Sequence, residues 1–153
     1  MQQGNWNIRQ LKQLLDKKIT GMSNDVRKGL ENAGKDYSRF FEWEADSVFK
    51  SNYMKNYYRI FQNRVNSTDN TDELKAFFDG IIKSQQERLI NVKPARYSTN
   101  PMANYAHSLS LECTQQLIQD CIGFVYILSI KEPKKDLREK AGQPEKKSNG
   151  LKI

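Results

Sequence analysis

A face rich in cations and amides occurs on the segment from Phe49 to Val65. When this segment is placed on a helix at roughly 100° per residue, one half of the wheel is polar and contains two cations one turn apart. The residues of this polar half are Asn52, Lys55, Asn56, Arg59 and Asn63. Cations neutralise phosphate charge and amides donate hydrogen bonds to phosphate oxygens, so these residue types suit a nucleic-acid backbone.

No carboxylate occurs between residues 50 and 65. A solvent-exposed helix face normally mixes acids with bases, because opposite charges one turn apart stabilise the helix. The pattern therefore predicts either a surface that binds a polyanion or an ordinary core helix whose outer face lacks acids. The apolar half of the wheel is expected to face a core, and it consists of Phe49, Tyr53, Met54, Tyr57, Tyr58, Ile60, Phe61 and Val65.

Residue types that serve catalysis or metal binding are sparse. The single histidine, His107, precedes Cys113, but this cysteine falls on an apolar stripe, so we expect no nucleophile–base pair. Glu42 and Asp46 lie one turn apart without a nearby histidine, and a solvated acidic face is expected there rather than a metal site. No glycine-rich phosphate loop occurs. We therefore expect no catalytic residues, metal or cofactor, and interpret the chain as a protein that is not an enzyme.

Length and composition favour a single domain. The chain has 153 residues, a hydrophobic fraction of 37% and a net charge of +7, which allows one core but not two. From Lys131 to Ile153, eight lysines and arginines stand against four acids. Such a segment buries too little apolar surface to offset the entropy of ordering it. Residues 131–153 are therefore predicted to be a disordered basic tail that follows a helical domain of residues 1–130.

The cysteines, the first residues and the apolar runs indicate the cellular compartment of the protein. Cys113 and Cys121 are expected to be buried free thiols in a reducing environment, because no Cys-x-x-Cys pair is present. The first residues lack the charged start and apolar run of a signal peptide. The longest apolar run, residues 121–130, is about half of what a membrane span needs. We therefore expect a soluble, cytoplasmic protein.

Apolar residues at helical spacing predict an all-α, single-domain bundle of about five helices. The expected helices cover residues 7–18, 26–33, 36 or 38 to about 65, 71–92 and 101–130. Gly21 and Gly34 are expected to end the first two helices, Pro94 to end the fourth, and Pro101 to begin the last. The third helix is expected either to bend at residues 50–51 or to continue through them.

Three placements relative to the core are also predicted. Trp43 is assigned to the core rather than to a partner, because buried aromatic anchors are the commoner case. Residues 83–88 are polar all round, which indicates that this part of its helix stands partly clear of the body. From Cys121 onward the last helix is apolar all round, which favours a central, buried position.

The segment from Phe49 to Tyr58 resembles the small subunit of type III CRISPR effector complexes, in its Csm-type branch. The resemblance consists of an apolar residue, small polar residues, an aliphatic residue, a cation and two aromatics, here Phe49, Ser51, Asn52, Met54, Lys55, Tyr57 and Tyr58. Lys50 stands where that family has a hydroxyl. A second family element, which closes the next long helix, is similar to Val92-Lys93-Pro94 with Arg96 and Tyr97 following.

The resemblance implies an all-helical bundle with no catalytic role of its own. Several copies would stack head to tail along other subunits of the complex and hold the duplex of guide RNA and target RNA, while base pairing supplies the sequence specificity. Combined with the charge pattern, it predicts RNA-binding residues at Asn52, Lys55, Asn56, Arg59, Asn63, Lys93 and Arg96. The Cmr-type small subunit, also helical and basic, is a close variant.

Two other classes of protein stay open. A scaffold, immunity or phage adaptor protein would use Trp43, the tyrosines and residues 83–88 for protein contacts and would bind no nucleic acid. A helical DNA-binding protein is less consistent with the sequence, because the tight turn and short recognition helix of a helix-turn-helix are not evident.

Overall fold

The computed structural model of the chain describes residues 3–91 and 100–133, and the all-α prediction is confirmed there. Five helices and no strand occur within these ranges. They are α1 (Gln3–Lys35), α2 (Tyr37–Trp43), α3 (Ala45–Asn66), α4 (Thr71–Ile90) and α5 (Pro101–Ser129). None of these helices is long and apolar enough to cross a membrane.

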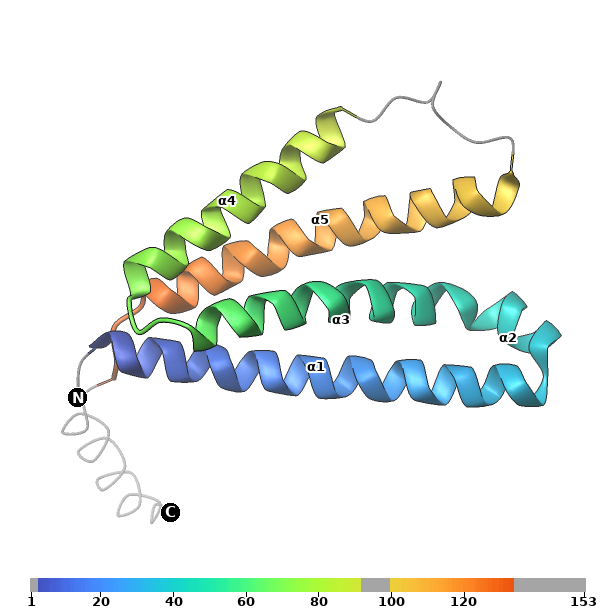
Figure 1. Cartoon of the computed structure of the whole chain (residues 1–153), viewed down its shortest axis with the longest axis horizontal. Helices are drawn as coiled ribbons and strands as arrows, with labels where there is room; N and C mark the ends of the chain where they lie inside the picture. Colours follow the sequence, from blue (N-terminus) through green and yellow to red (C-terminus); the bar gives the residue numbers. More distant parts are fainter. Residues whose placement is uncertain (1–2, 92–99, 134–153) are drawn as a thin grey trace, which may run out of the picture.

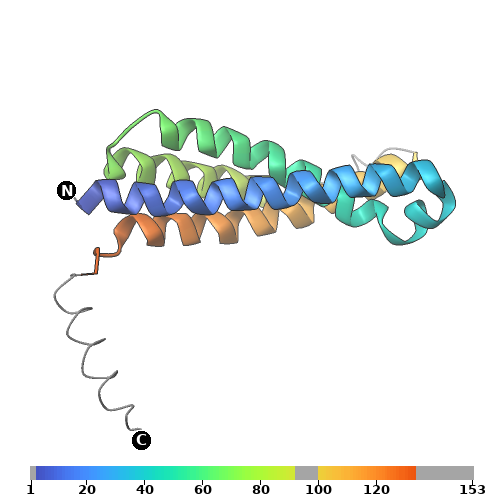
Figure 2. The same ribbon diagram turned by 90° about the horizontal axis from the view of Figure 1, so that it is seen from below.

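The helices form two packed pairs. α1 lies along α3 and α4 lies along α5, and the four long helices alternate in direction (Figure 1). α5 also contacts α1 and α3, which joins the pairs into one bundle. The view from below shows α2 as a corner at the end of the bundle far from the N-terminus (Figure 2).

The core lies in the half of the bundle that contains the start of α1 and the end of α5. Its buried residues are Ile8, Leu11, Leu15, Met54, Tyr58, Phe61, Val65, Leu74, Phe78, Cys113, Leu117, Cys121, Phe124 and Leu128. Phe78 stands edge-on to Phe61 and Phe124, with ring centroids 5.4 and 5.3 Å apart, in the range that aromatic pairs prefer. The prediction that both cysteines are buried free thiols is confirmed.

The prediction of two short helices before residue 36 is wrong, because α1 is continuous for 33 residues. Gly21 lies inside it, and a β-carbon added to this glycine would have no neighbour within 4 Å. The glycine costs the helix only about 1 kcal/mol relative to alanine. The apolar stripe continues past Gly21 through Met22, which packs against the core. Burial of a continuous stripe against α3 outweighs one unfavourable residue.

The third predicted helix is divided at Glu44 and not at residues 50–51. Asp36 caps α2, and its side chain accepts a hydrogen bond of 3.1 Å from the backbone N–H of Arg39. The placement of Trp43 in the core is wrong, since this side chain is 78% exposed. α2 has no buried residue, because it turns the corner at the end of the bundle and packs mainly against α1 and α3.

The starts of α4 and α5 agree with the sequence prediction. Asn70 caps α4 by accepting hydrogen bonds from the backbone N–H groups of Asp72 and Glu73, at 2.9 and 3.1 Å. Asn100 caps α5 in the same way, and Pro101 is its first residue. The predicted role of Pro94 in ending α4 falls outside the described residues.

Two placements on α4 and α5 are corrected. Residues 83–88 do not stand clear of the body, because Gln85 is only 7% exposed and Arg88 reaches side chains of α3 and α5. The end of α5 is not buried all round, because Ile122 and Tyr126 are 49% and 66% exposed. A polar run can lie inward when a facing helix supplies hydroxyl groups, and an apolar run can remain exposed when no helix covers it.

Asn7 joins the start of α1 to the end of α5. Its buried side-chain amide donates hydrogen bonds of 2.6 and 2.7 Å to the carbonyl oxygens of Ile127 and Ile130. These carbonyls lie at the C-terminal end of α5, where intrahelical donors run out. The predicted disorder of the basic tail concerns residues 134–153 almost entirely, and these lie outside the described residues.

Candidate nucleic-acid interface

α3 is held in place by its buried face. Met54, Tyr58, Phe61 and Val65 point into the core, while the hydroxyl of Tyr58 donates a hydrogen bond to the carboxylate of Asp120 on α5. Burial, followed by this hydrogen bond, raises the pKa of Tyr58 well above its ordinary value of 10.0. The tyrosine therefore stays neutral and fixes the rotation of α3 relative to α5.

The predicted polar residues of α3 share its outer side. Asn52, Asn56, Arg59 and Asn63 are exposed, and Lys55 is half-buried at the edge of the same side. From Asn52 to Asn63 the α3 strip, as we call these five residues, extends about 16 Å along the helix axis at 1.5 Å per residue. The structure thus presents together the five predicted residues that lie on α3.

The two cations of the α3 strip are not neutralised by the rest of the bundle. Across residues 3–91 and 100–133, neither Lys55 nor Arg59 forms an ion pair or a hydrogen bond with a carboxylate. By contrast, the cations at either end of α3 are paired: Lys50 Nζ lies 2.5 Å from Glu112 Oε1, and Arg64 Nη2 lies 3.9 Å from Glu73 Oε1. The hydrogen bond to Glu112 raises the pKa of Lys50.

A carboxylate from another helix lies beside the α3 strip. Asp16 of α1 accepts a hydrogen bond from the side-chain amide of Gln62, the neighbour of Asn63. Residues 50–65 contain no acid, but in the folded chain a carboxylate of α1 lies beside them. Among the described residues Asp16 forms no ion pair with Lys55 or Arg59, so both cations remain available to an anion.

Lys93 and Arg96, the other two predicted RNA-binding residues, fall outside the described residues.

The polar residues 83–88 hold a feature that was not predicted from the sequence. Arg88 donates hydrogen bonds to the hydroxyl of Tyr53 at 2.9 Å and to that of Ser110 at 3.0 Å. It also donates to the hydroxyl of the fully buried Thr114.

This Arg88 cluster joins α3, α4 and α5 through neutral hydroxyls. Ser110 and Thr114 each donate their own proton to a carbonyl of α5, at 2.7 and 3.0 Å, and so present lone pairs to the guanidinium. Burial is the main cause that raises the pKa of Tyr53. The sequence does carry a signal for this cluster: Ser110 and Thr114 lie one turn apart on the side of α5 that is otherwise apolar, and buried hydroxyls need hydrogen-bond partners.

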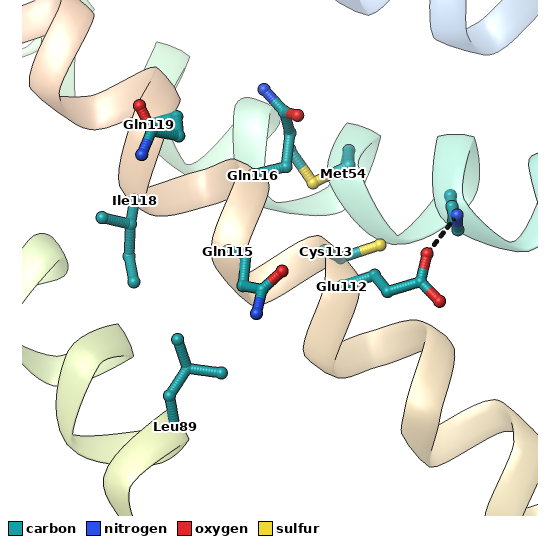
Figure 3. A pocket seen from close by; sticks show the side chains of 9 residues that line it. Met54, Leu89, Glu112, Cys113, Gln115, Gln116, Ile118 and Gln119 are labelled. Atoms are coloured by element: carbon teal, nitrogen blue, oxygen red, sulfur yellow. Dashed lines mark hydrogen bonds and ion pairs between the residues drawn. The ribbon is translucent and has the colours of Figure 1, made fainter.

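An open cavity of about 650 Å³ lies between α3, α5 and the end of α4. Figure 3 shows Met54, Cys113 and Glu112 beside one another, with Leu89 of α4 across the opening from Gln115 and Ile118. Burial raises the pKa of the Cys113 thiol, which keeps it protonated and weakens it as a nucleophile. Among the described residues, no group of three or more histidine, cysteine or acidic side chains is placed to hold a metal ion.

No protein-family model matches the chain, and neither does any curated protein or solved structure. The resemblance of residues 49–58 to a CRISPR small subunit stays a hypothesis that depends on the sequence.

Proposed function

We propose that this chain is a non-catalytic, RNA-binding small subunit of a type III CRISPR ribonucleoprotein. Several copies would stack head to tail with one another along other subunits of the complex and contact the backbone of the guide–target RNA duplex in antiviral defence. The observation that carries the proposal is the α3 strip, whose two cations have no carboxylate partner among the described residues. The resemblance at residues 49–58 suggests that the complex is a type III CRISPR effector.

The chemistry of the α3 strip suits phosphate groups. Lys55 and Arg59 lie four residues apart, or about 6 Å along the helix axis, and each can neutralise a phosphate and release counterions. Asn52, Asn56 and Asn63 flank them and add neutral donors. Contacts of this kind position a duplex without reading its sequence, which is the role left to a protein when guide pairing supplies the specificity.

The test is the salt dependence of binding to an RNA duplex. Affinity would be measured by fluorescence anisotropy between low and moderate salt for the wild type and for the double variant Lys55→Ala/Arg59→Ala. Loss of two phosphate contacts is expected to lower the slope of log affinity against log salt by about 1.4 to 1.8. Circular dichroism would check that the double variant keeps its helix content.

Lys17→Ala/Lys83→Ala is the matched control. It removes the same charge from exposed positions on α1 and α4, so a general loss of basicity would affect both double variants equally. Equal slopes for the two double variants, or no binding by the wild type at any salt concentration, would contradict the proposed function. Co-purification with other subunits of an effector complex would test the family assignment separately.

A second candidate function is that of a helical interaction or adaptor protein that binds no nucleic acid. It is favoured by exposed aromatic side chains on α2, namely Tyr37, Phe41 and Trp43. Large exposed aromatics next to one another are typical of protein contact sites. Binding of a protein partner without any salt-dependent affinity for RNA would select this alternative.

A further inference from the structure

A groove lies at the end of the bundle that α2 forms, away from the α3 strip. Phe41, Glu42, Asp46 and Phe49 line one side and Met102 and Tyr105 of α5 line the other, around a volume of about 260 Å³. We call it the α2 groove. The Tyr105 hydroxyl donates a hydrogen bond to the Asp46 carboxylate across its edge, which joins the start of α3 to the start of α5.

Large apolar and aromatic side chains in the α2 groove are about half exposed to solvent. Phe41, Met102 and Tyr105 are 47%, 51% and 47% exposed, because the buried core lies in the other half of the bundle and no helix among the described residues covers this end. A contiguous exposed patch of large apolar side chains is typical of a surface that a partner buries.

The charge around the α2 groove is opposite to that of the whole chain. The charged residues that line the groove are two carboxylates, Glu42 and Asp46, whereas the chain carries a net charge of +7. Glu42 at the groove forms no hydrogen bond or ion pair with another described residue. An acidic, aromatic surface repels a nucleic-acid backbone and attracts a basic peptide that has apolar anchors.

The chain contains such a peptide at residues 134–153. Seven lysines and arginines stand there against three acids, and Leu137, Leu151 and Ile153 each neighbour a basic residue. This segment follows α5, which starts at the α2 groove and runs to the opposite end of the bundle (Figure 1). The 29 residues of α5 place those two ends about 43 Å apart.

We infer that the α2 groove of one copy takes residues 134–153 from a neighbouring copy. At roughly 3.3–3.6 Å per fully extended residue, residues 134–151 would have to be about 70% extended to span the roughly 43 Å to the groove of the same copy, so docking there costs more chain entropy than docking in an adjoining copy. In a head-to-tail row, the end of one bundle where the segment begins adjoins the groove end of the next. The neighbouring copies come from the proposed function, on which this docking rests.

Sedimentation velocity of the full chain at low salt tests the docking. The wild type is expected to form concentration-dependent oligomers, and excess synthetic peptide of residues 134–153 is expected to return them to monomers. Phe41→Ala and Glu42→Lys are each expected to weaken self-association about tenfold, the usual size of loss for an interface anchor. Ile122→Ala, which truncates an equally exposed side chain on another surface, is expected to change nothing.

A charge exchange makes the test specific. Lys146→Glu/Lys147→Glu in the basic segment is expected to weaken association and, when combined with Glu42→Lys, to restore much of it. A chain that stays monomeric, oligomers that persist in saturating peptide, or equal effects of Phe41→Ala and Ile122→Ala would each overturn the docking. RNA affinity measured on the same samples separates the two proposals, because Phe41→Ala leaves the α3 strip intact.

Discussion

Replacing Arg88 with alanine is expected to destabilise the bundle more than any change on its outer surface. The guanidinium donates to hydroxyls on two other helices, Tyr53 on α3 and both Ser110 and Thr114 on α5. Removing it takes three hydrogen bonds from side chains that are buried or half-buried. No carboxylate balances its charge among the described residues, so the hydroxyls alone hold it in place.

The expected size of the effect follows from those contacts. Hydrogen bonds that involve a charged group contribute about 1.5–3 kcal/mol each. Simple addition overestimates the loss, because Arg88 itself is half-buried and water can reach part of the site after truncation. We therefore expect Arg88→Ala to lower the free energy of unfolding by about 2–4 kcal/mol, with a fall in Tm of roughly 5–15 °C.

Urea denaturation followed by circular dichroism would measure this change. Arg88→Lys is expected to recover only part of the stability, because an ammonium cannot spread its donors as a guanidinium does. Lys83→Ala on the exposed side of the same helix is the control and is expected to stay within about 0.5 kcal/mol of the wild type.

A double-mutant cycle between Arg88→Ala and Thr114→Val would isolate one contact. A coupling free energy of about 1 kcal/mol is expected for groups that share a hydrogen bond. The reasoning is refuted if Arg88→Ala is as mild as Lys83→Ala, or if the two changes in the cycle are simply additive.

Two further predictions concern packing and ionisation. At Gly29 an added Cβ would lie 2.2 Å from Cγ2 of Val48, whereas at Gly21 it would meet nothing within 4 Å. In thermal unfolding Gly29→Ala should therefore destabilise by about 1–3 kcal/mol and Gly21→Ala stabilise by up to about 1 kcal/mol; the same sign for both would contradict this. Burial raises the pKa of the Cys121 thiol from 9.0 to about 12, so above pH 9 the unfolded chain releases a proton that the fold retains. Stability should fall as pH rises from about 9 to 12, and in urea titrations Cys121→Ala should make that fall shallower by up to one proton; unchanged slopes would contradict the assignment.

The helices themselves were largely predictable. Apolar residues at helical spacing need a buried face, and the starts of α4 and α5 carry local signals, an acidic first turn after Thr71 and a proline at position 101. All four buried residues of α3 belong to the predicted apolar half, whereas Phe49, Tyr53 and Tyr57 of that half are only partly buried and Ile60 is 54% exposed. Periodicity identifies a face, but it does not reveal how wide a strip of that face a neighbouring helix covers.

Boundaries were less predictable because the local signals are weak. Gly21 disfavours a helix by about 1 kcal/mol, which is less than the burial of one large apolar side chain contributes. The continuous packing of α1 against α3 therefore decided that α1 has no break there. The division at Glu44 also has a tertiary cause. The chain must reverse direction between α1 and α3, and α2 turns this corner, so α3 begins only after Glu44.

By itself, the amino-acid sequence determined that this chain is helical, which faces are apolar, and that residues 50–65 carry cations and no acid. These are properties of residues within a few turns of one another, and side-chain spacing on a helix is set by local geometry. Only the tertiary structure decided that Arg88 turns inward to three hydroxyls, that Trp43 remains outside, and that Asp16 borders the α3 strip. Each depends on what a distant helix supplies, which the spacing of residues along one helix cannot specify.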